Sequence, residues 1–67
     1  MKQLTKERER LGWSKSELAR RTGLHPSQVG LIEAGRFLPY PRQLAKIAAA
    51  LGWPEDEAER LLEEVNA

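Results

Sequence analysis

Cysteine is absent from this chain, histidine occurs once, and only four of the 67 residues are aromatic. Without cysteine, neither a disulfide nor a thiolate metal site can form. No apolar run approaches the roughly 20 residues that a membrane-spanning helix needs, and residues 1–11 are charged, unlike a signal peptide. We therefore expect a soluble, cytoplasmic protein that has no membrane partner and no metal or other cofactor.

The short length limits what the chain can do. Sixty-seven residues suffice for one small core, so we expect a single domain over residues 1–67. A catalytic cleft with its supporting shell needs a longer chain. The serines between residues 14 and 27 suit helix starts, and the acidic cluster at 55–57 lacks metal-site spacing. We expect neither an enzyme nor a site for a small-molecule ligand.

Charge is distributed unevenly, although the net charge is only +1. Residues 1–42 carry nine Lys or Arg against four Glu, whereas residues 43–67 carry two Lys or Arg against six Asp or Glu. This asymmetry favours a basic face for a polyanion, with an acidic last helix turned elsewhere. On charge alone, the solvation of helical surfaces explains it equally well.

The stretch Ser14–Gly35 predicts two short helices joined at Gly23. Ser14 and Glu17 have the S-x-x-E spacing of a reciprocal capping box at a helix start. Gly23 suits the left-handed backbone that ends a helix, and Pro26 suits the first turn of the next one. Both helices are too short to be stable alone, so they must pack against the rest of the chain.

Small and apolar residues in this stretch fit a known pattern. Two helices that cross steeply need a small residue where their axes approach, and Ala19 and Gly23 supply it on either side of the bend. With the apolar residues Leu18, Leu24, Val29 and Ile32, the stretch resembles the helix-turn-helix of the Cro and lambda-repressor-like, or xenobiotic-response-element, family of DNA-binding domains. The resemblance continues through Gly35, Pro39, Leu44, Ala48, Leu51 and Gly52.

The resemblance implies an all-α, five-helix fold with the helix-turn-helix at the second and third helices. Apolar periodicity, with proline and glycine at helix ends, predicts the other helices over residues 3–11, from Pro41 to Gly52, and from Pro54 onward. Leu4 and Leu11 form the apolar side of the first helix. The apolar face of the fifth is Ala58, Leu61, Leu62 and Val65.

The same resemblance implies an ion pair between Arg8 in the first helix and Glu33 near the end of the third. We expect this pair to be partly buried and structural. Removing one partner of such a pair typically costs about 3 to 5 kcal/mol, because the other charge is left unpaired.

Helix-turn-helix docking inserts the N-terminal residues of the second motif helix into the major groove of duplex DNA. The outward candidates for base contact, opposite Val29 and Ile32, are Pro26, Ser27, Gln28 and Leu31. Gln28 is the first candidate, since a glutamine amide pairs with adenine at two points. The apolar atoms of Pro26 and Leu31 suit thymine methyl groups. Alternatively, Leu31 belongs to the core and Ser27 only starts the helix.

Phosphate contacts are expected from helix N-termini and basic side chains. The candidates are Lys15, Ser16, His25, Arg36, Tyr40 and Arg42. For His25, a simple capping role is equally plausible. Neutralising about four to six phosphates per half-site predicts a slope of log affinity against log salt near −0.9 per phosphate.

A monomer of this size covers little DNA, so we expect a homodimer on two half-sites. Leu62, Val65 and Trp53 are the interface candidates, although Trp53 suits core packing too. By resemblance the chain is a sequence-specific transcriptional regulator, more specifically a repressor. The competing hypothesis is a protein-interaction module, or an antitoxin whose last helix binds a toxin, because an exposed apolar stripe also fits a protein partner.

Overall fold

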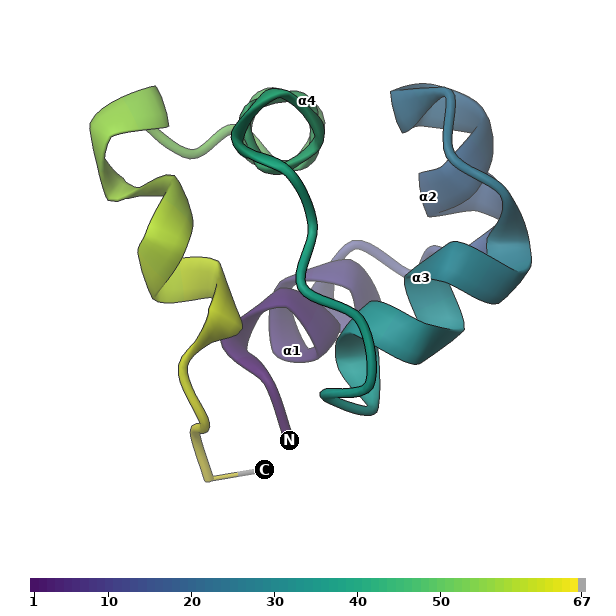
Figure 1. Cartoon of the computed structure of the whole chain (residues 1–67). Helices are drawn as coiled ribbons and strands as arrows, with labels where there is room; N and C mark the ends of the chain where they lie inside the picture. The colour runs from purple at the N-terminus through teal and green to yellow at the C-terminus, as the bar shows by residue number, and fades with distance from the viewer. Residues whose placement is uncertain (67) are drawn as a thin grey trace.

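The computed structural model describes residues 1–66 and contains five helices. Four α-helices are followed by one 3-10 helix: α1 (Gln3–Arg10), α2 (Lys15–Thr22), α3 (Pro26–Glu33), α4 (Pro41–Leu51) and η1 (Glu55–Leu62) (Figure 1). Within the described residues, the only β pairing is one isolated bridge. The predicted all-α, five-helix fold is therefore confirmed. None of the described helices is long and apolar enough to cross a membrane.

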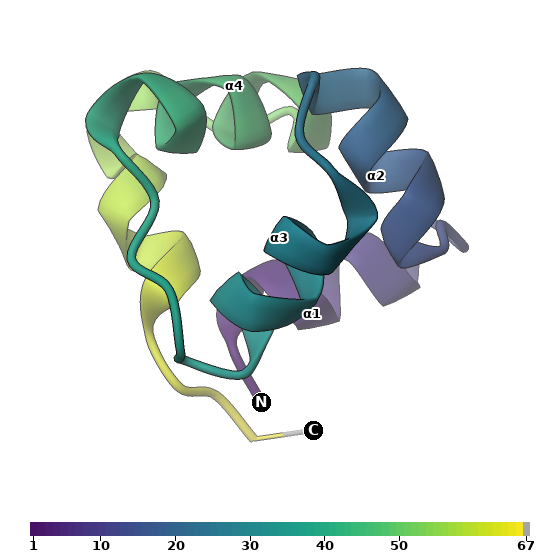
Figure 2. The ribbon, with the colours of Figure 1, turned by 45° about the vertical axis from the view of Figure 1, so that its right-hand side comes forward.

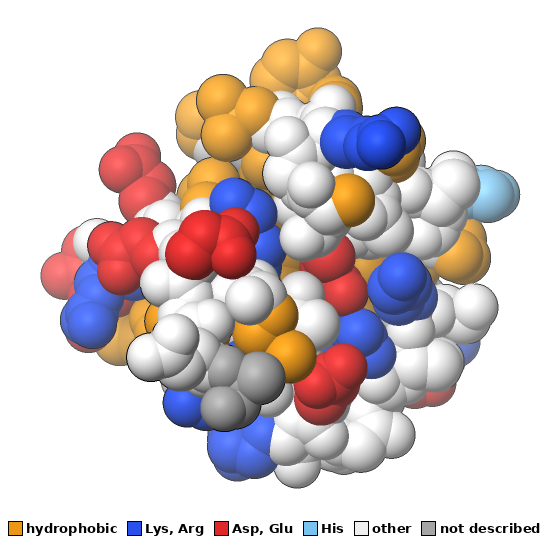
Figure 3. Space-filling model, turned by 90° about the horizontal axis from the view of Figure 1, so that it is seen from below, with side chains coloured by type: hydrophobic (Ala, Val, Ile, Leu, Met, Phe, Trp, Pro, Cys, Tyr) orange, Lys and Arg blue, Asp and Glu red, His pale blue; other side chains and the backbone are white. Residues whose placement is uncertain are grey.

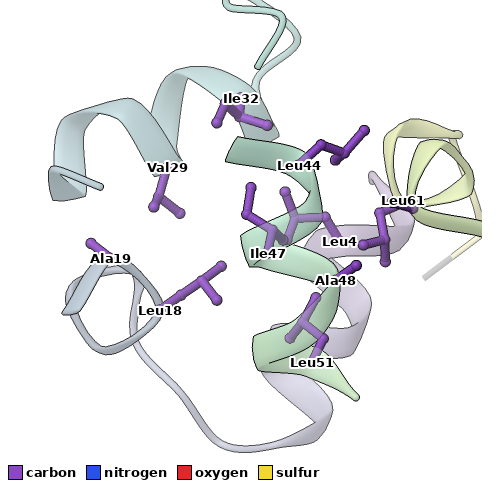
Figure 4. Packing of buried hydrophobic residues seen from close by; sticks show 11 residues of the cluster. Leu4, Leu18, Ala19, Val29, Ile32, Leu44, Ile47, Ala48, Leu51 and Leu61 are labelled. Atoms are coloured by element: carbon purple, nitrogen blue, oxygen red, sulfur yellow. The ribbon is translucent and has the colours of Figure 1, made fainter. Parts of the chain in front are cut away.

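The core lies where all five helices meet. Val29 and Ile32 point inward from α3, towards Leu18 of α2 and Ile47 of α4 (Figure 4). The predicted stripe of α4 is buried throughout, whereas Leu11 is 36% exposed. Placing Leu11 beside Leu4 was wrong, because α1 ends at Arg10 and Leu11 is its C-cap residue. The second buried position of α1 belongs instead to Arg8.

The turn between α2 and α3 depends on the backbone angle of Gly23. Its φ is +75°, a left-handed conformation that side chains other than glycine rarely adopt. A Cβ added there would meet no atom within 4 Å, so glycine is required for its angle and not to make room. Room is needed at Ala19, which is 1% exposed between the helices.

The start of α2 has only half of the predicted capping box. The Ser14 hydroxyl accepts a hydrogen bond from the Glu17 backbone N–H at 3.0 Å. The Glu17 carboxylate does not return the contact, because it pairs with Arg20 and Arg21 on its own helix.

The two ends of the described chain pair with each other (Figure 1). The Gln3 backbone N–H donates to the Glu63 carbonyl at 2.8 Å, and the Lys2 ammonium donates to the Leu62 carbonyl at 3.0 Å. Val65 lies in this extended segment and donates its backbone N–H to the Met1 carbonyl. The prediction that Val65 continues the apolar face of the fifth helix was wrong, because η1 ends at Leu62.

Candidate nucleic-acid interface

One side of helix α3 packs against the core, and its other side faces outward (Figure 2). Val29 and Ile32 are each 1% exposed, whereas Pro26 and Ser27 are exposed and Leu31 is 43% exposed. The alternative that Leu31 belongs to the core therefore does not hold. The outward side predicted from the sequence is the side that the fold leaves open.

The polar side chains at the start of α3 are bonded to one another. The His25 Nδ1 accepts a hydrogen bond from the Ser27 backbone N–H at 3.2 Å and lies 2.8 Å from the Ser27 hydroxyl. The Gln28 Oε1 accepts from the His25 backbone N–H at 2.9 Å. His25 and Gln28 thus form a reciprocal capping box at the start of α3, whereas the one predicted at the start of α2 is incomplete. The capping role considered for His25 is present, and Gln28 is half-buried with its carbonyl oxygen engaged.

The N-terminal end of α2 lies beside α3. Lys15 and Ser16 are both exposed in the first turn of α2, where backbone N–H groups favour an anion. The Lys15 side chain extends across α3, with its Nζ 3.9 Å from the position that a Cβ on Gly30 would occupy. The Lys15 ammonium therefore lies next to α3 at the level of Gly30.

The basic side chains separate into paired and unpaired groups. Six form ion pairs within the protein: Lys2, Arg8, Arg10, Arg20, Arg21 and Arg60. Within residues 1–66, the five that form none are Lys6, Lys15, Arg36, Arg42 and Lys46. All three basic residues predicted to bind phosphate are in this second group.

The loop after α3 carries the remaining phosphate candidates. Arg36 follows the C-terminal end of α3, and its backbone N–H donates to the Leu31 carbonyl at 2.8 Å. Tyr40 caps α4 and is 67% exposed, with its ring edge-to-face against Phe37. Arg42 is exposed in the first turn of α4. These side chains are available to an anion at the two helix ends that flank the loop.

The side of the molecule that carries the termini displays charges of both signs (Figure 3). Basic and acidic side chains are intermixed there, in part through the contacts of Lys2 and the N-terminal amine with Glu64. A hydrogen bond from Lys2 is the main cause that holds the pKa of Glu64 below its ordinary value.

The ion pair expected between Arg8 and Glu33 is present. Arg8 Nε lies 2.7 Å from one carboxylate oxygen and Nη2 lies 3.0 Å from the other. Arg8 Nη1 also donates to the Trp13 carbonyl at 2.7 Å. The hydrogen bonds with Glu33 raise the pKa of Arg8, outweighing burial, which lowers it. The pair joins α1 to the last turn of α3.

The predicted dimer-interface residues lie in three different environments. Trp53 is partly buried and packs against the core, as its alternative interpretation stated. Val65 belongs to the pairing of the chain ends. Leu62 lines an open groove of about 570 Å³ between the start of α4 and η1. Sequence reasoning missed this groove, whose other lining residues include Leu38, Leu44, Ala58 and Glu59.

Leu38 is the most exposed large apolar side chain among the described residues, with 76% of its surface accessible. It stands at the edge of the groove. The only signal in the sequence was an apolar residue within the predicted surface loop 35–41, and such a residue alone does not identify a surface.

Comparison with known proteins agrees with this geometry. A family model described as a helix-turn-helix domain matches residues 2–61, which include α1 to α4 in full and η1 up to Leu61. No curated protein matches the chain significantly.

Proposed function

Because this chain belongs to the helix-turn-helix domain family, we propose that it is a sequence-specific regulator of transcription that binds duplex DNA through α3. The observation that carries the proposal is the open side of α3, flanked by Lys15 and Arg36. Val29 and Ile32 fix the opposite side in the core. Helix-turn-helix docking requires such an outward helix, with phosphate-binding groups on both sides of it.

We infer that the protein acts in the cytoplasm and that it neither catalyses a reaction nor binds a small-molecule ligand. We further infer that it is a repressor. A repressor needs only to occupy its site on DNA. The resemblance to the phage-repressor type supports that direction of regulation.

The first test is a gel shift with random-sequence duplex DNA at about 50 and 200 mM salt. Binding that weakens strongly at the higher salt supports phosphate contacts. Selection from a random duplex pool then gives the preferred site. Absence of binding at the lower salt contradicts the proposal.

We also propose that the protein acts as a homodimer joined at the groove beside η1. A two-fold interface must be complementary to itself, so it needs a projection and a recess on one surface. Leu38 and the groove provide both. In Figures 1 and 2, η1 lies on the other side of α4 from α2, so an interface beside η1 leaves α2 uncovered.

One observation favours the competing function, a protein-interaction module or antitoxin. The groove is apolar at its base and has Glu55 and Glu59 in its lining, and neither forms an ion pair within the described chain. A basic, apolar segment of another protein would fit such a surface. Salt-dependent binding to duplex DNA separates this function from regulation of transcription, because an interaction module lacks that binding.

A further inference from the structure

We propose that α3 recognises thymine through its 5-methyl group, and that Leu31 is the side chain that contacts it. This inference rests on the proposed function and specifies what its DNA-facing surface selects. It assigns the main role in recognition to an apolar contact, where the sequence had favoured the Gln28 amide.

The polar side chains at the start of α3 already form hydrogen bonds within the protein. Pairing with adenine at two points requires both the oxygen and the nitrogen of a glutamine amide. In this structure the Gln28 oxygen accepts the His25 backbone N–H, and the Ser27 hydroxyl lies against His25 Nδ1. Turning the Gln28 amide towards a base breaks the capping box with His25, and a helix cap typically contributes about 1 kcal/mol to stability. Turning the Ser27 hydroxyl breaks its contact with His25 Nδ1. Both losses weaken the contribution of these side chains to base recognition.

The free side of α3 is uncharged and carries mostly small side chains. The residues at helical spacing on this side are Pro26, Ser27, Gly30, Leu31 and Ala34. None is charged, and Leu31 is the only one with a large side chain. Leu31 is 43% exposed, so much of its side chain is in contact with solvent.

The base edges in the major groove offer one apolar group to such a side chain. Thymine is the only one of the four bases that presents a methyl group there. Small residues on either side of Leu31 let the helix approach closely, and the apolar side chain then displaces water from that methyl group. Burying one methyl group corresponds to about 0.8 kcal/mol, or roughly fourfold in affinity.

The test replaces thymine with uracil, which lacks only the methyl group. A duplex enriched by selection is synthesised once with thymine and once with uracil, and fluorescence anisotropy measures the affinity of the full chain for each. We expect the uracil duplex to bind about fourfold more weakly for each methyl group in contact. The variant Leu31→Ala should bind both duplexes with nearly equal affinity.

The matched control is Leu11→Ala, which removes an equally large side chain, 36% exposed, from the C-cap position of α1. This variant should keep the preference for thymine. Equal affinity of the parent protein for both duplexes overturns the inference while leaving the proposed function intact, as does a preference that survives Leu31→Ala. Failure to bind either duplex overturns the proposed function itself.

Discussion

Arg8 and Glu33 connect the first helix to the last turn of α3 by two hydrogen bonds of 2.7 and 3.0 Å. Their side chains are only 9% and 7% exposed. Each charge therefore depends on the other for solvation. This pair fixes one end of α3, while Val29 and Ile32 fix its inner side, so the orientation of the outward side follows from both.

Replacing Arg8 with alanine should lower the free energy of unfolding by about 3 to 5 kcal/mol, because the Glu33 carboxylate remains buried without a partner. Urea denaturation measures the loss. Arg60→Ala is the control, since it removes a partner from the exposed pair of Arg60 with Glu57, and such pairs contribute about 0 to 1 kcal/mol. A loss below about 1 kcal/mol for Arg8→Ala would contradict the structural role.

Arg36→Ala should reduce the slope of log affinity against log salt by about one, because one phosphate contact is lost. Titrations of duplex DNA at several salt concentrations give the slope. Arg60→Ala serves as the matched control, since Arg60 lies on η1 and is paired with Glu57 at 2.7 Å. An unchanged slope for Arg36→Ala, or an equal change in both variants, would contradict the assignment of Arg36.

Substitution of Gln28 separates capping from recognition. Gln28→Ala should lower the free energy of unfolding by about 1 kcal/mol, because the His25 backbone N–H loses its acceptor. Gln28→Glu keeps an acceptor at the same place and should unfold close to the parent protein. Equal losses in the two variants, measured by thermal unfolding, would mean that the hydrogen bond to His25 contributes nothing.

Stability should fall in acid partly through Glu17. The hydrogen bond from Arg20 is the main cause that holds the pKa of Glu17 below its ordinary value of 4.5, assisted by Arg21. A carboxyl group whose pKa is lowered by folding stabilises the protein above its unfolded-state pKa, and that contribution is lost as the pH falls through the folded-state pKa. We therefore expect Tm to decrease below about pH 4.5.

Glu17→Gln should show a shallower decrease of Tm with falling pH than the parent protein. Glu59→Gln is the control, because Glu59 forms no ion pair with any residue of the described chain. Parallel acid profiles for Glu17→Gln and the parent protein would exclude this contribution.

Leu38→Glu should weaken self-association at the groove, since it places a charge on the proposed projection. Sedimentation velocity at increasing protein concentration, with and without DNA, measures the effect. Leu11→Glu changes the exposed leucine at the C-cap of α1 and should leave association unaltered. A parent protein that stays monomeric both free and on DNA refutes the dimer.

The helices could be predicted from the sequence because their ends carry strong local signals. Gly23 and Pro26 fix the turn, and the stripe of α4 has no polar interruption. The pairing of Arg8 with Glu33 came from the family resemblance. The helix ends and the α4 stripe, unlike this pair, follow from glycine, proline and apolar periodicity, which a single sequence displays directly.

Other features required three dimensions. The Glu17 carboxylate pairs with two nearby arginines and not with the Ser14 backbone N–H. Residue spacing alone does not predict which of these partners is preferred. Val65 was placed on a helix because the apolar period continues past Leu62, whereas pairing with Met1 ends the helix there. The groove depends on Leu38 and η1 lying side by side, although they are far apart in the sequence.

The most direct test of the outward orientation of α3 is an NMR titration of isotope-labelled protein with the selected duplex. We predict that amide shifts concentrate at residues 27–31, at Lys15, and at Arg36, Tyr40 and Arg42, while the amides of η1 change little. Shifts confined to the groove between α4 and η1, with α3 unaffected, would contradict it.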